Sequence, residues 1–331
     1  MSYFSIIVPV YNRPEEVRGL LESLALQSCK DFELVLVEDG SDIPCKEVVD
    51  SFEGRIDVKY FYKDNAGRSA ARNYGLERAG GEYFVFFDSD CVIPPGYFTA
   101  LKEALGKDFT PCFGGPDAAS DDFSDLQKAI NFSMTSFLTT GGIRGGKVQM
   151  EKFVPRSFNM GFSREVWEKV GGFREMLAED LDLSIRIRKA GYTARLIREA
   201  FVYHKRRVSL RRFAKQTYMF GTGRVGLKLI WPESLKAVHC LPALFLLGCI
   251  FLIVCSFFRW WAILPLAAYV LALWLSALVK TKSLKIACMA VVTSFIQLCC
   301  YGYGFIKAYI WEVLLGHGRN VNKELKMRRE S

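Results

Sequence analysis

The sequence lacks the cysteine spacings that mark zinc sites and disulfide frameworks. Its ten cysteines include no Cys-x-x-Cys pair, and six of them lie in the apolar C-terminal third of the chain. We therefore expect neither a zinc site nor a disulfide framework. The cysteines should act as small apolar side chains in a reducing compartment. The opening MSYFSIIVPVYNR also lacks a basic leader followed by a long apolar stretch, so we expect no signal peptide and a cytosolic N-terminal domain.

Charge is missing from three long segments near the C-terminus. Residues 238–258, 260–279 and 286–306 contain no Asp, Glu, Lys or Arg. A helix of 21 residues is about 32 Å long, close to the hydrocarbon thickness of a bilayer. We therefore predict membrane segments within residues 238–316, and favour this interpretation over buried helices of a soluble core.

Acidic residues are absent between positions 200 and 232, where eight basic residues lie: Lys205, Arg206, Arg207, Arg211, Arg212, Lys215, Arg224 and Lys228. The net charge of the chain is +9, and removing these eight leaves 9 − 8 = +1. Because the basic excess directly precedes the first apolar segment and no nucleic-acid motif accompanies it, anionic membrane lipid is the expected partner rather than nucleic acid. We predict a basic interfacial helix or linker over residues 205–237, with the stretch from Lys205 to Lys228 on the lipid surface.

Basic residues on both sides of the third apolar segment set a topological constraint. Lys280, Lys282 and Lys285 precede it, and the basic tail 317–331 follows it. Both groups favour the cytosolic side, which a single crossing by residues 286–306 would not allow. We predict that the first two segments form a tight hairpin, and that the third is re-entrant or lies partly in the interface. The protein would then be a multi-pass protein of the cytoplasmic membrane with a cytosolic tail.

The first half of the chain alternates between apolar runs and helical patterns. Strands are expected at 4–10, 32–39, 55–62 and 82–88, with helices starting at Pro14 and spanning 66–79. This alternation predicts an α/β domain with a largely parallel sheet, here residues 1–204. Ligands of such sheets bind beyond the carboxyl ends of the strands, where four aspartates fall: Asp39, Asp64, Asp88 and Asp90.

The second half of this domain has a different pattern. A helix is expected near 123–138, followed by the Gly-rich stretch TTGGIRGGK, a strand over 157–163 and a helix over 164–170. A further helix begins with AEDLDL, which places Glu179 and Asp180 in its first turn. The helix dipole alone could account for acidic residues there.

The stretch FVFFDSDCV ends a buried strand with two carboxylates, Asp88 and Asp90. Because side chains alternate along an extended chain, both carboxylates point to the same side. Two like charges at a strand end favour a bound cation, and the alternative is an ordinary polar turn.

Six motifs together resemble glycosyltransferase family 2, whose members have the GT-A fold, a Rossmann-like α/β domain. They occur in the family's order from residue 4 to about 225: SIIVPVYNR, VEDGSD, NAGRSAARNYG, FFDSD, GGFRE and AEDLDL. The resemblance implies an inverting, membrane-anchored transferase of bacterial type that uses a nucleotide-diphosphate sugar. It also implies a divalent ion, Mn²⁺ or Mg²⁺, with Asp90 as its ligand and Asp88 bound to the ribose or to metal-bound water.

The same resemblance suggests roles for further residues. Asp39 would lie near the nucleobase, Pro9 and Tyr11 would line the nucleoside pocket, and Arg72 would lie near the carboxylates and phosphates. Asn65 and Gly67 would shape the loop beneath the base. Asp180 resembles the general base, which takes the proton from the acceptor hydroxyl. Glu179 and Asp182 are weaker candidates, since Asp182 is roughly 200° round the helix from Asp180.

Three residues near the end of the domain are less clearly assigned. His204 would complete the metal shell or touch the diphosphate, or it is a boundary histidine with no ligand. Gln216 and Arg224 would close over the diphosphate as in processive relatives. The QxxRW signature of polysaccharide synthases is absent, which favours transfer of a single sugar.

Several functional alternatives stay open. The acceptor is expected to be a lipid-linked glycan or a surface-polysaccharide precursor, and a polyprenyl-phosphate sugar synthase is the second possibility. FVFFDSDCV also fits haloacid dehalogenase-type phosphatases, in which Asp88 would be the nucleophile. A membrane scaffold without catalytic activity is disfavoured, because both the carboxylate pair and the base candidate are present.

Overall fold

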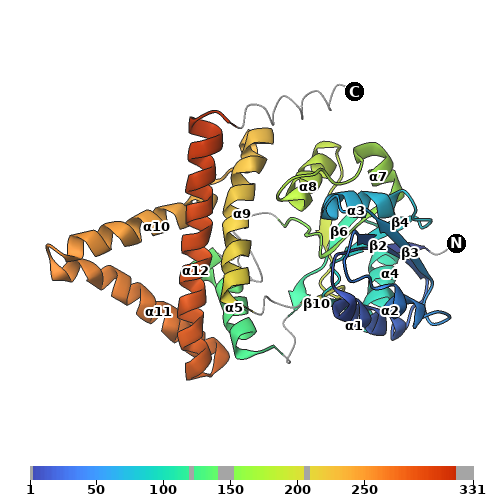
Figure 1. Ribbon diagram of the computed structural model, residues 1–331, viewed down its shortest axis with the longest axis horizontal. Helices are drawn as coiled ribbons and strands as arrows, with labels where there is room; N and C mark the ends of the chain where they lie inside the picture. The colour runs from blue at the N-terminus through green and yellow to red at the C-terminus, as the bar shows by residue number, and fades with distance from the viewer. Residues whose placement is uncertain (1–2, 119–122, 141–152, 205–208, 318–331) are drawn as a thin grey trace. The chain divides into compact units, whose positions relative to one another are not determined.

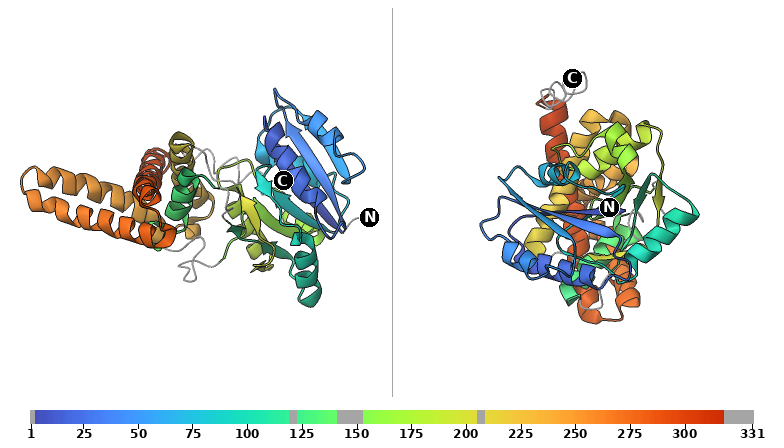
Figure 2. Two further views of the ribbon diagram at one scale, coloured as in Figure 1. Left: turned by 90° about the horizontal axis from the view of Figure 1, so that it is seen from below. Right: turned by 90° about the vertical axis from the view of Figure 1, so that its right-hand side faces the viewer.

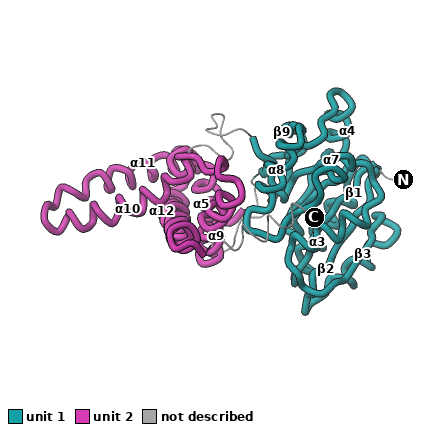
Figure 3. The backbone as a smooth tube through the Cα atoms, turned by 90° about the horizontal axis from the view of Figure 1, so that it is seen from above, with its two compact units in different colours: residues 1–120, 153–205 teal, residues 121–152, 206–331 magenta. Residues whose placement is uncertain are grey.

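The computed structural model describes residues 3–118, 123–140, 153–204 and 209–317, which form two compact units (Figure 3). The first unit comprises residues 1–120 and 153–205, and the second comprises 121–152 and 206–331. The predicted boundary near residue 204 coincides with the second crossover between the units. The prediction placed residues 121–152 in the N-terminal domain 1–204, whereas the structure groups them with the C-terminal helices.

The first unit is built on a seven-stranded sheet in which only β8 is antiparallel to its neighbours. In spatial order the strands are β3 (Val58–Lys63), β2 (Phe32–Asp39), β1 (Phe4–Val10), β4 (Tyr83–Phe87), β8 (Asn159–Ser163), β6 (Cys112–Gly114) and β9 (Ala194–Leu196). The predicted strands at 4–10, 32–39 and 82–88 are confirmed, and β3 begins three residues later than expected. The mostly parallel α/β sheet is confirmed as well.

Helices cover both faces of this sheet, since the central strands are apolar on both sides. Ile6 and Leu34 face α1 and α4, whereas Ile7 and Val35 face α3 and α8. The helices of this unit are α1 (Pro14–Ala25), α2 (Lys46–Asp50), α3 (Arg68–Leu76), α4 (Tyr97–Lys107), α7 (Arg164–Val170) and α8 (Glu179–Lys189), as Figure 1 shows. A Cβ at Gly75 would lie 2.7 Å from Ile7 Cγ2, so a glycine lets α3 approach β1 closely.

A second, three-stranded sheet brings the end of the domain beside the aspartate pair. It consists of β5 (Cys91–Val92), β10 (Val202–His204) and β7 (Asp117–Ala118). In its antiparallel register His204 is opposite Cys91, the residue after Asp90.

The second unit is helical. It contains α5 (Asp125–Thr135), α6 (Phe137–Thr140), α9 (Leu210–Ile230), α10 (Ala237–Ser256), α11 (Leu264–Thr281) and α12 (Leu284–Ala308), with short turns η1 (Pro232–Ser234), η2 (Trp260–Ile263) and η3 (Tyr309–Leu314). Three of its helical stretches are long and apolar enough to span a membrane: Ala237–Ser256, Trp260–Thr281 and Leu284–Leu314. They match the three predicted segments.

The helices α10 and α11 form a V-shaped hairpin that diverges from the η2 turn toward α12 (Figure 1), so the predicted tight hairpin is wrong. The start of α10 and the end of α11 both pack against α12. In Figure 1 the hairpin runs across the direction of α12 and α9, and in the left view of Figure 2 α12 is seen nearly end-on while the hairpin extends sideways. A re-entrant segment would need a break, and α12 is one unbroken helix. The interfacial alternative for this segment stays a prediction, and the tail 318–331 lies outside the described residues.

Small residues bring α9 and α12 into close contact. A Cβ at Gly221 would lie 2.1 Å from the backbone oxygen of Tyr301, and a Cβ at Gly304 would lie 2.3 Å from that of Tyr218. The predicted basic helix is therefore partly a packed helix, whose residues Phe213 and Val225 are fully buried. Residues 205–208 of that prediction lie outside the described residues.

The Gly221 contact predicts opposite effects of the same substitution at two sites in α9. Gly221→Ala should destabilise the protein by about 1 to 3 kcal/mol, because the added methyl group meets backbone atoms that cannot move aside. Gly226→Ala is the control: a Cβ there meets nothing within 4 Å, so stability should be unchanged or rise by up to about 1 kcal/mol. Thermal unfolding of the detergent-purified chain measures both. Equal unfolding temperatures for the two variants would contradict the close packing.

Candidate active site

The carboxylates at the ends of the parallel strands differ in their hydrogen-bond partners and in their exposure. Asp39 ends β2, Asp64 follows β3, and Asp88 and Asp90 follow β4, as predicted. Tyr11, just beyond β1, is 49% exposed at the same edge. The partners of each carboxylate, described next, separate structural groups from groups available to a ligand.

Asp39 anchors the loop that leads into α3. Its Oδ1 accepts a hydrogen bond from Ala66 N–H at 3.0 Å, and its Oδ2 accepts one from Gly67 N–H at 2.9 Å. The Asn65 side-chain amide donates to the backbone oxygen of Asp39 at 2.8 Å. Gly67 has φ of +93°, a conformation that favours glycine. The structure thus brings Asp39, Asn65 and Gly67 together, while their predicted contacts with a nucleobase stay predictions.

Arg72 connects the aspartate pair with the start of α8. Its guanidinium donates to Asp88 Oδ1 at 2.9 Å and to Glu179 Oε1 at 2.9 Å, and Arg68 donates to Glu179 Oε2 at 2.8 Å. Arg72 and Glu179 are 1% and 2% exposed, whereas the side chain of Asp88 is 34% exposed. Phe173 lies 5.2 Å from the guanidinium carbon. Asp88 and Arg68 are therefore the exposed members of a network whose centre, the Arg72–Glu179 pair, is buried.

Asp90 has a partner that the motifs did not reveal. Arg13 Nη1 donates to Asp90 Oδ2 at 2.9 Å. Arg13 follows Asn12, which has φ of +53° and accepts a hydrogen bond on Oδ1 from Ile43 N–H at 3.0 Å. The conformation of Asn12 is thus tied to the loop after β2, and it directs Arg13 toward the aspartate pair. The stretch SIIVPVYNR contained Arg13, but its sequence carried no sign of this long-range contact.

The donor set fits a divalent ion that takes its remaining ligands from water or a bound phosphate. The described residues include no group of three or more His, Cys, Asp or Glu side chains that could hold an ion alone. Mg²⁺ is usually bound by one or two carboxylates together with phosphate oxygens and water, and Asp88 and Asp90 supply two carboxylates. The backbone of His204 lies opposite Cys91, next to this pair. A role of His204 in the metal shell stays a prediction.

Asp180 and Asp182 have different environments although they lie two residues apart. Asp182 is fully buried and binds Arg174 at 3.1 Å and Arg186 at 2.8 Å. Asp180 is 16% exposed, and its Oδ2 lies 3.7 Å from Arg156 Nη1. Asp182 is therefore a structural ion-pair partner. Asp180 keeps the exposure that a proton acceptor needs, and its role as base stays a prediction.

Glu175, in the motif GGFRE, lies close to Gly67 and is a further carboxylate that was not among the residues predicted from the sequence. A Cβ at Gly67 would lie 3.3 Å from Glu175 Oε2. Partial burial, together with the nearby charges of Asp39 and Glu179, raises the pKa of Glu175 above its ordinary value. The loop after α7 thus adds a carboxylate close to the Asp39 loop.

The two predicted closing-loop residues belong to the other unit. Gln216 and Arg224 both lie in α9, and both are partly exposed. Their predicted contact with a diphosphate stays a prediction.

A comparison with known protein families identifies the family of this chain. The family model "Glycosyl transferase family 2" matches residues 5–171, about half of the chain. The chain belongs to glycosyltransferase family 2. The stretch FVFFDSD lies within the matched region, so the family assignment weighs against the phosphatase alternative for Asp88.

Named relatives and a solved structure agree with this assignment. The "Glycosyltransferase GlyA" of Streptococcus pneumoniae is 41% identical over 102 residues, 30% of this chain and 15% of that protein. A Campylobacter jejuni protein named "GalNAc(5)-diNAcBac-PP-undecaprenol beta-1,3-glucosyltransferase" is 31% identical over 117 residues, 34% of this chain and 38% of that protein. The chain therefore spans well under half of the length of either relative.

The solved structure confirms the GT-A fold. It is a mannosyltransferase from Pyrobaculum calidifontis in complex with GDP-Man and Mn²⁺, with a TM-score of 0.60 and 18% sequence identity. The match covers 94% of this chain and 88% of that one. At this identity the likeness concerns the fold.

The contrast between the two aspartates of α8 predicts different effects on stability. Asp182→Asn should lower the free energy of unfolding by about 3 kcal/mol, because it leaves two arginines without their shared buried carboxylate. Asp180→Asn should change it by less than about 1 kcal/mol, since the ion pair with Arg156 is long and the amide oxygen of Asn can still accept the hydrogen bond from Leu181 N–H. Thermal unfolding of both variants in one detergent tests this. A greater loss for Asp180→Asn would reverse the assignment.

Proposed function

We propose that this glycosyltransferase inverts the anomeric carbon as it moves one sugar from a nucleotide-diphosphate donor to a hydroxyl of a lipid-linked acceptor. The observation that carries the proposal is the position of Arg72. Its guanidinium binds Asp88 on one side and Glu179 on the other, and Glu179 is the neighbour of Asp180. The carboxylate pair for the donor and the candidate base are thus held on either side of one buried side chain.

Each group has a distinct task in this proposal. Asp88 and Asp90 would hold a divalent ion, which stabilises the negative charge of the leaving diphosphate. The Arg13 guanidinium at Asp90 would give way to the ion and remain near the phosphates. Asp180 would accept the proton of the acceptor hydroxyl as that oxygen attacks the anomeric carbon. Arg72 would fix the position of Asp88 relative to the start of α8.

The relatives support the choice of substrates. The name of the Campylobacter jejuni relative specifies an acceptor linked to undecaprenol through a diphosphate, and the Pyrobaculum calidifontis structure contains GDP-Man and Mn²⁺. Three apolar helices in the present chain suit an enzyme whose acceptor is in a membrane. The likeness to a lipid-linked glucosyltransferase favours a lipid-linked glycan over a simple polyprenyl phosphate as acceptor.

The second unit supports a specific arrangement in the cytoplasmic membrane. The 20 residues of α10 make a helix of about 30 Å, long enough to cross the bilayer. The turn of the hairpin carries Arg259, Trp260 and Trp261, residue types that favour the membrane–water interface. If the hairpin crosses and returns, α12 lies across it along the near interface. Lys280 and the basic tail then stay on the cytosolic side together.

The two carboxylate sites should respond differently to substitution. Asp90→Ala should weaken Mn²⁺-dependent binding of nucleotide as well as turnover, because it removes a metal ligand. Asp180→Asn should leave nucleotide binding intact and lower sugar transfer roughly 10²-fold or more, because an amide cannot accept the proton. Calorimetry with and without Mn²⁺, together with mass spectrometry of the lipid product, measures the two effects.

Asp64→Asn is the matched control for this experiment, since Asp64 is an exposed carboxylate at the same sheet edge. It should keep both binding and transfer near the parent values. Near-parental transfer by Asp180→Asn, or an unchanged metal dependence in Asp90→Ala, would refute the division of roles.

The membrane arrangement predicts where introduced cysteines can be labelled. In intact cells a membrane-impermeant maleimide should label Arg259→Cys at the hairpin turn above the parent background. Ser331→Cys in the tail should be labelled only after permeabilisation. Labelling of Ser331→Cys in intact cells would mean that the third apolar segment crosses the bilayer.

A further inference from the structure

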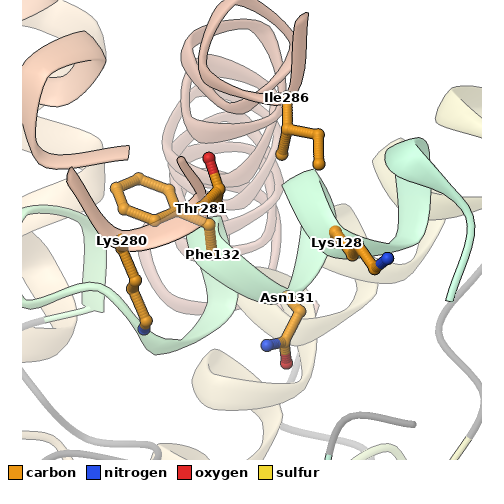
Figure 4. A pocket seen from close by; sticks show the side chains of 6 residues that line it. All are labelled: Lys128, Asn131, Phe132, Lys280, Thr281 and Ile286. Carbon is orange, nitrogen blue, oxygen red and sulfur yellow. The ribbon is translucent and has the colours of Figure 1, made fainter. Parts of the chain in front are cut away.

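Lysine and apolar side chains together line a pocket in the second unit. Its volume is about 290 Å³, and α5, α11 and α12 form it. Figure 4 shows its six lining residues: Lys128, Asn131, Phe132, Lys280, Thr281 and Ile286. Phe132 and Ile286 are buried, whereas both lysines are exposed. The lining of the pocket therefore combines two ammonium groups, an amide and a hydroxyl with two apolar side chains.

The charges at this pocket suit an anion. Lys280 donates to Thr135 Oγ1 at 3.3 Å and lies 5.8 Å from the ring centre of Phe132, both uncharged groups. Lys285, one residue before Ile286, binds Asp125 at 2.7 Å. The charges of Lys285 and Lys128 act on Asp125, whereas the printed contacts of Lys280 are with Thr135 and Phe132. The positive end of the α12 dipole, at residues 284–286, adds to the positive potential.

The surroundings of the pocket are suited to hydrocarbon. Leu275 and Val279 on α11 are 47% and 78% exposed, and Leu284 on α12 is 62% exposed. Lys280 and Thr281 are the last two residues of the apolar helix α11. An apolar surface that ends at a basic pocket matches the boundary between acyl chains and headgroups in a bilayer.

We propose that this pocket binds the phosphate of an anionic diacyl phospholipid, with Lys128 and Lys280 holding the headgroup and the acyl chains lying along α11. A phosphate-bearing lipid meets both the charge of the pocket and the exposed apolar residues beside it, whereas a free ion meets only the charge. Basic pockets beside membrane helices on the cytoplasmic side are typical sites for anionic headgroups. The site goes beyond the transfer reaction, since none of its residues belongs to the donor or base groups described above.

The test uses the detergent-purified full chain and phosphatidylglycerol, with phosphatidylcholine as the uncharged comparison. Native mass spectrometry should show phosphatidylglycerol retained by the parent, and thermal unfolding should show that it protects the parent more than phosphatidylcholine does. The double variant Lys128→Gln/Lys280→Gln should bind phosphatidylglycerol about 25-fold more weakly, at about fivefold per lysine. The double variant Lys107→Gln/Lys169→Gln changes the charge equally on α4 and α7 of the first unit, away from both the pocket and the basic stretch, and should bind like the parent.

The outcomes separate the possible ligands. Equal retention of phosphatidylglycerol by the two double variants, or equal protection by both lipids, would overturn the site. Protection by inorganic phosphate as strong as that by phosphatidylglycerol would make it an ion site, and a clear preference for polyprenyl phosphate would make it an acceptor site; either result refutes the phospholipid proposal. Calorimetry of nucleotide binding to the same variants tests the proposed transferase function separately, and should give the parent affinity.

Discussion

One buried guanidinium sets the constraint on which the catalytic unit depends. Arg72 is 1% exposed and its positive charge is balanced by Asp88 and Glu179. A buried charge without partners is strongly unfavourable, so α3, the end of β4 and the start of α8 must be positioned together. These elements are up to 107 residues apart in the sequence. Their alignment also determines where Asp88 and Asp180 lie, because each is next to, or part of, this ion-pair network.

Burial and partner number divide the acidic residues of the site into two groups. Asp39, Glu179 and Asp182 are nearly inaccessible and accept hydrogen bonds from backbone amides or arginines, so their charges maintain the structure. The side chains of Asp88 and Asp180 are more exposed, at 34% and 16%, whereas Asp90 is buried and paired with Arg13. The site can therefore hold many carboxylates at one sheet edge without all of them competing for the same cation.

Much of the first unit could be predicted from its sequence, because local patterns determine its elements. The apolar strands and the helix starting at Pro14 follow from periodicity and terminal residues. The motifs predicted that Asp39, Asn65, Gly67, Arg72 and Asp88 share a donor site, which stays a prediction. The structure shows contacts of Asp39 with Asn65 and Gly67, and of Arg72 with Asp88. By contrast, Arg13 and Arg156 were missed, since each contacts its aspartate only through folding of distant segments. The union of 121–152 with the C-terminal helices was missed for the same reason.

In the second unit, composition predicts which helices are apolar, and packing indicates which helices lie against one another. Hydropathy located all three apolar helices, but it could not distinguish a helix that crosses the bilayer from one that packs along other helices. The glycines provide information on packing, because Gly221 and Gly304 allow α9, a basic and partly polar helix, to lie against the backbone of α12. A helix with basic residues cannot follow α12 through hydrocarbon without burying those charges at high cost. The close α9–α12 contact therefore supports the interfacial position proposed for these two helices.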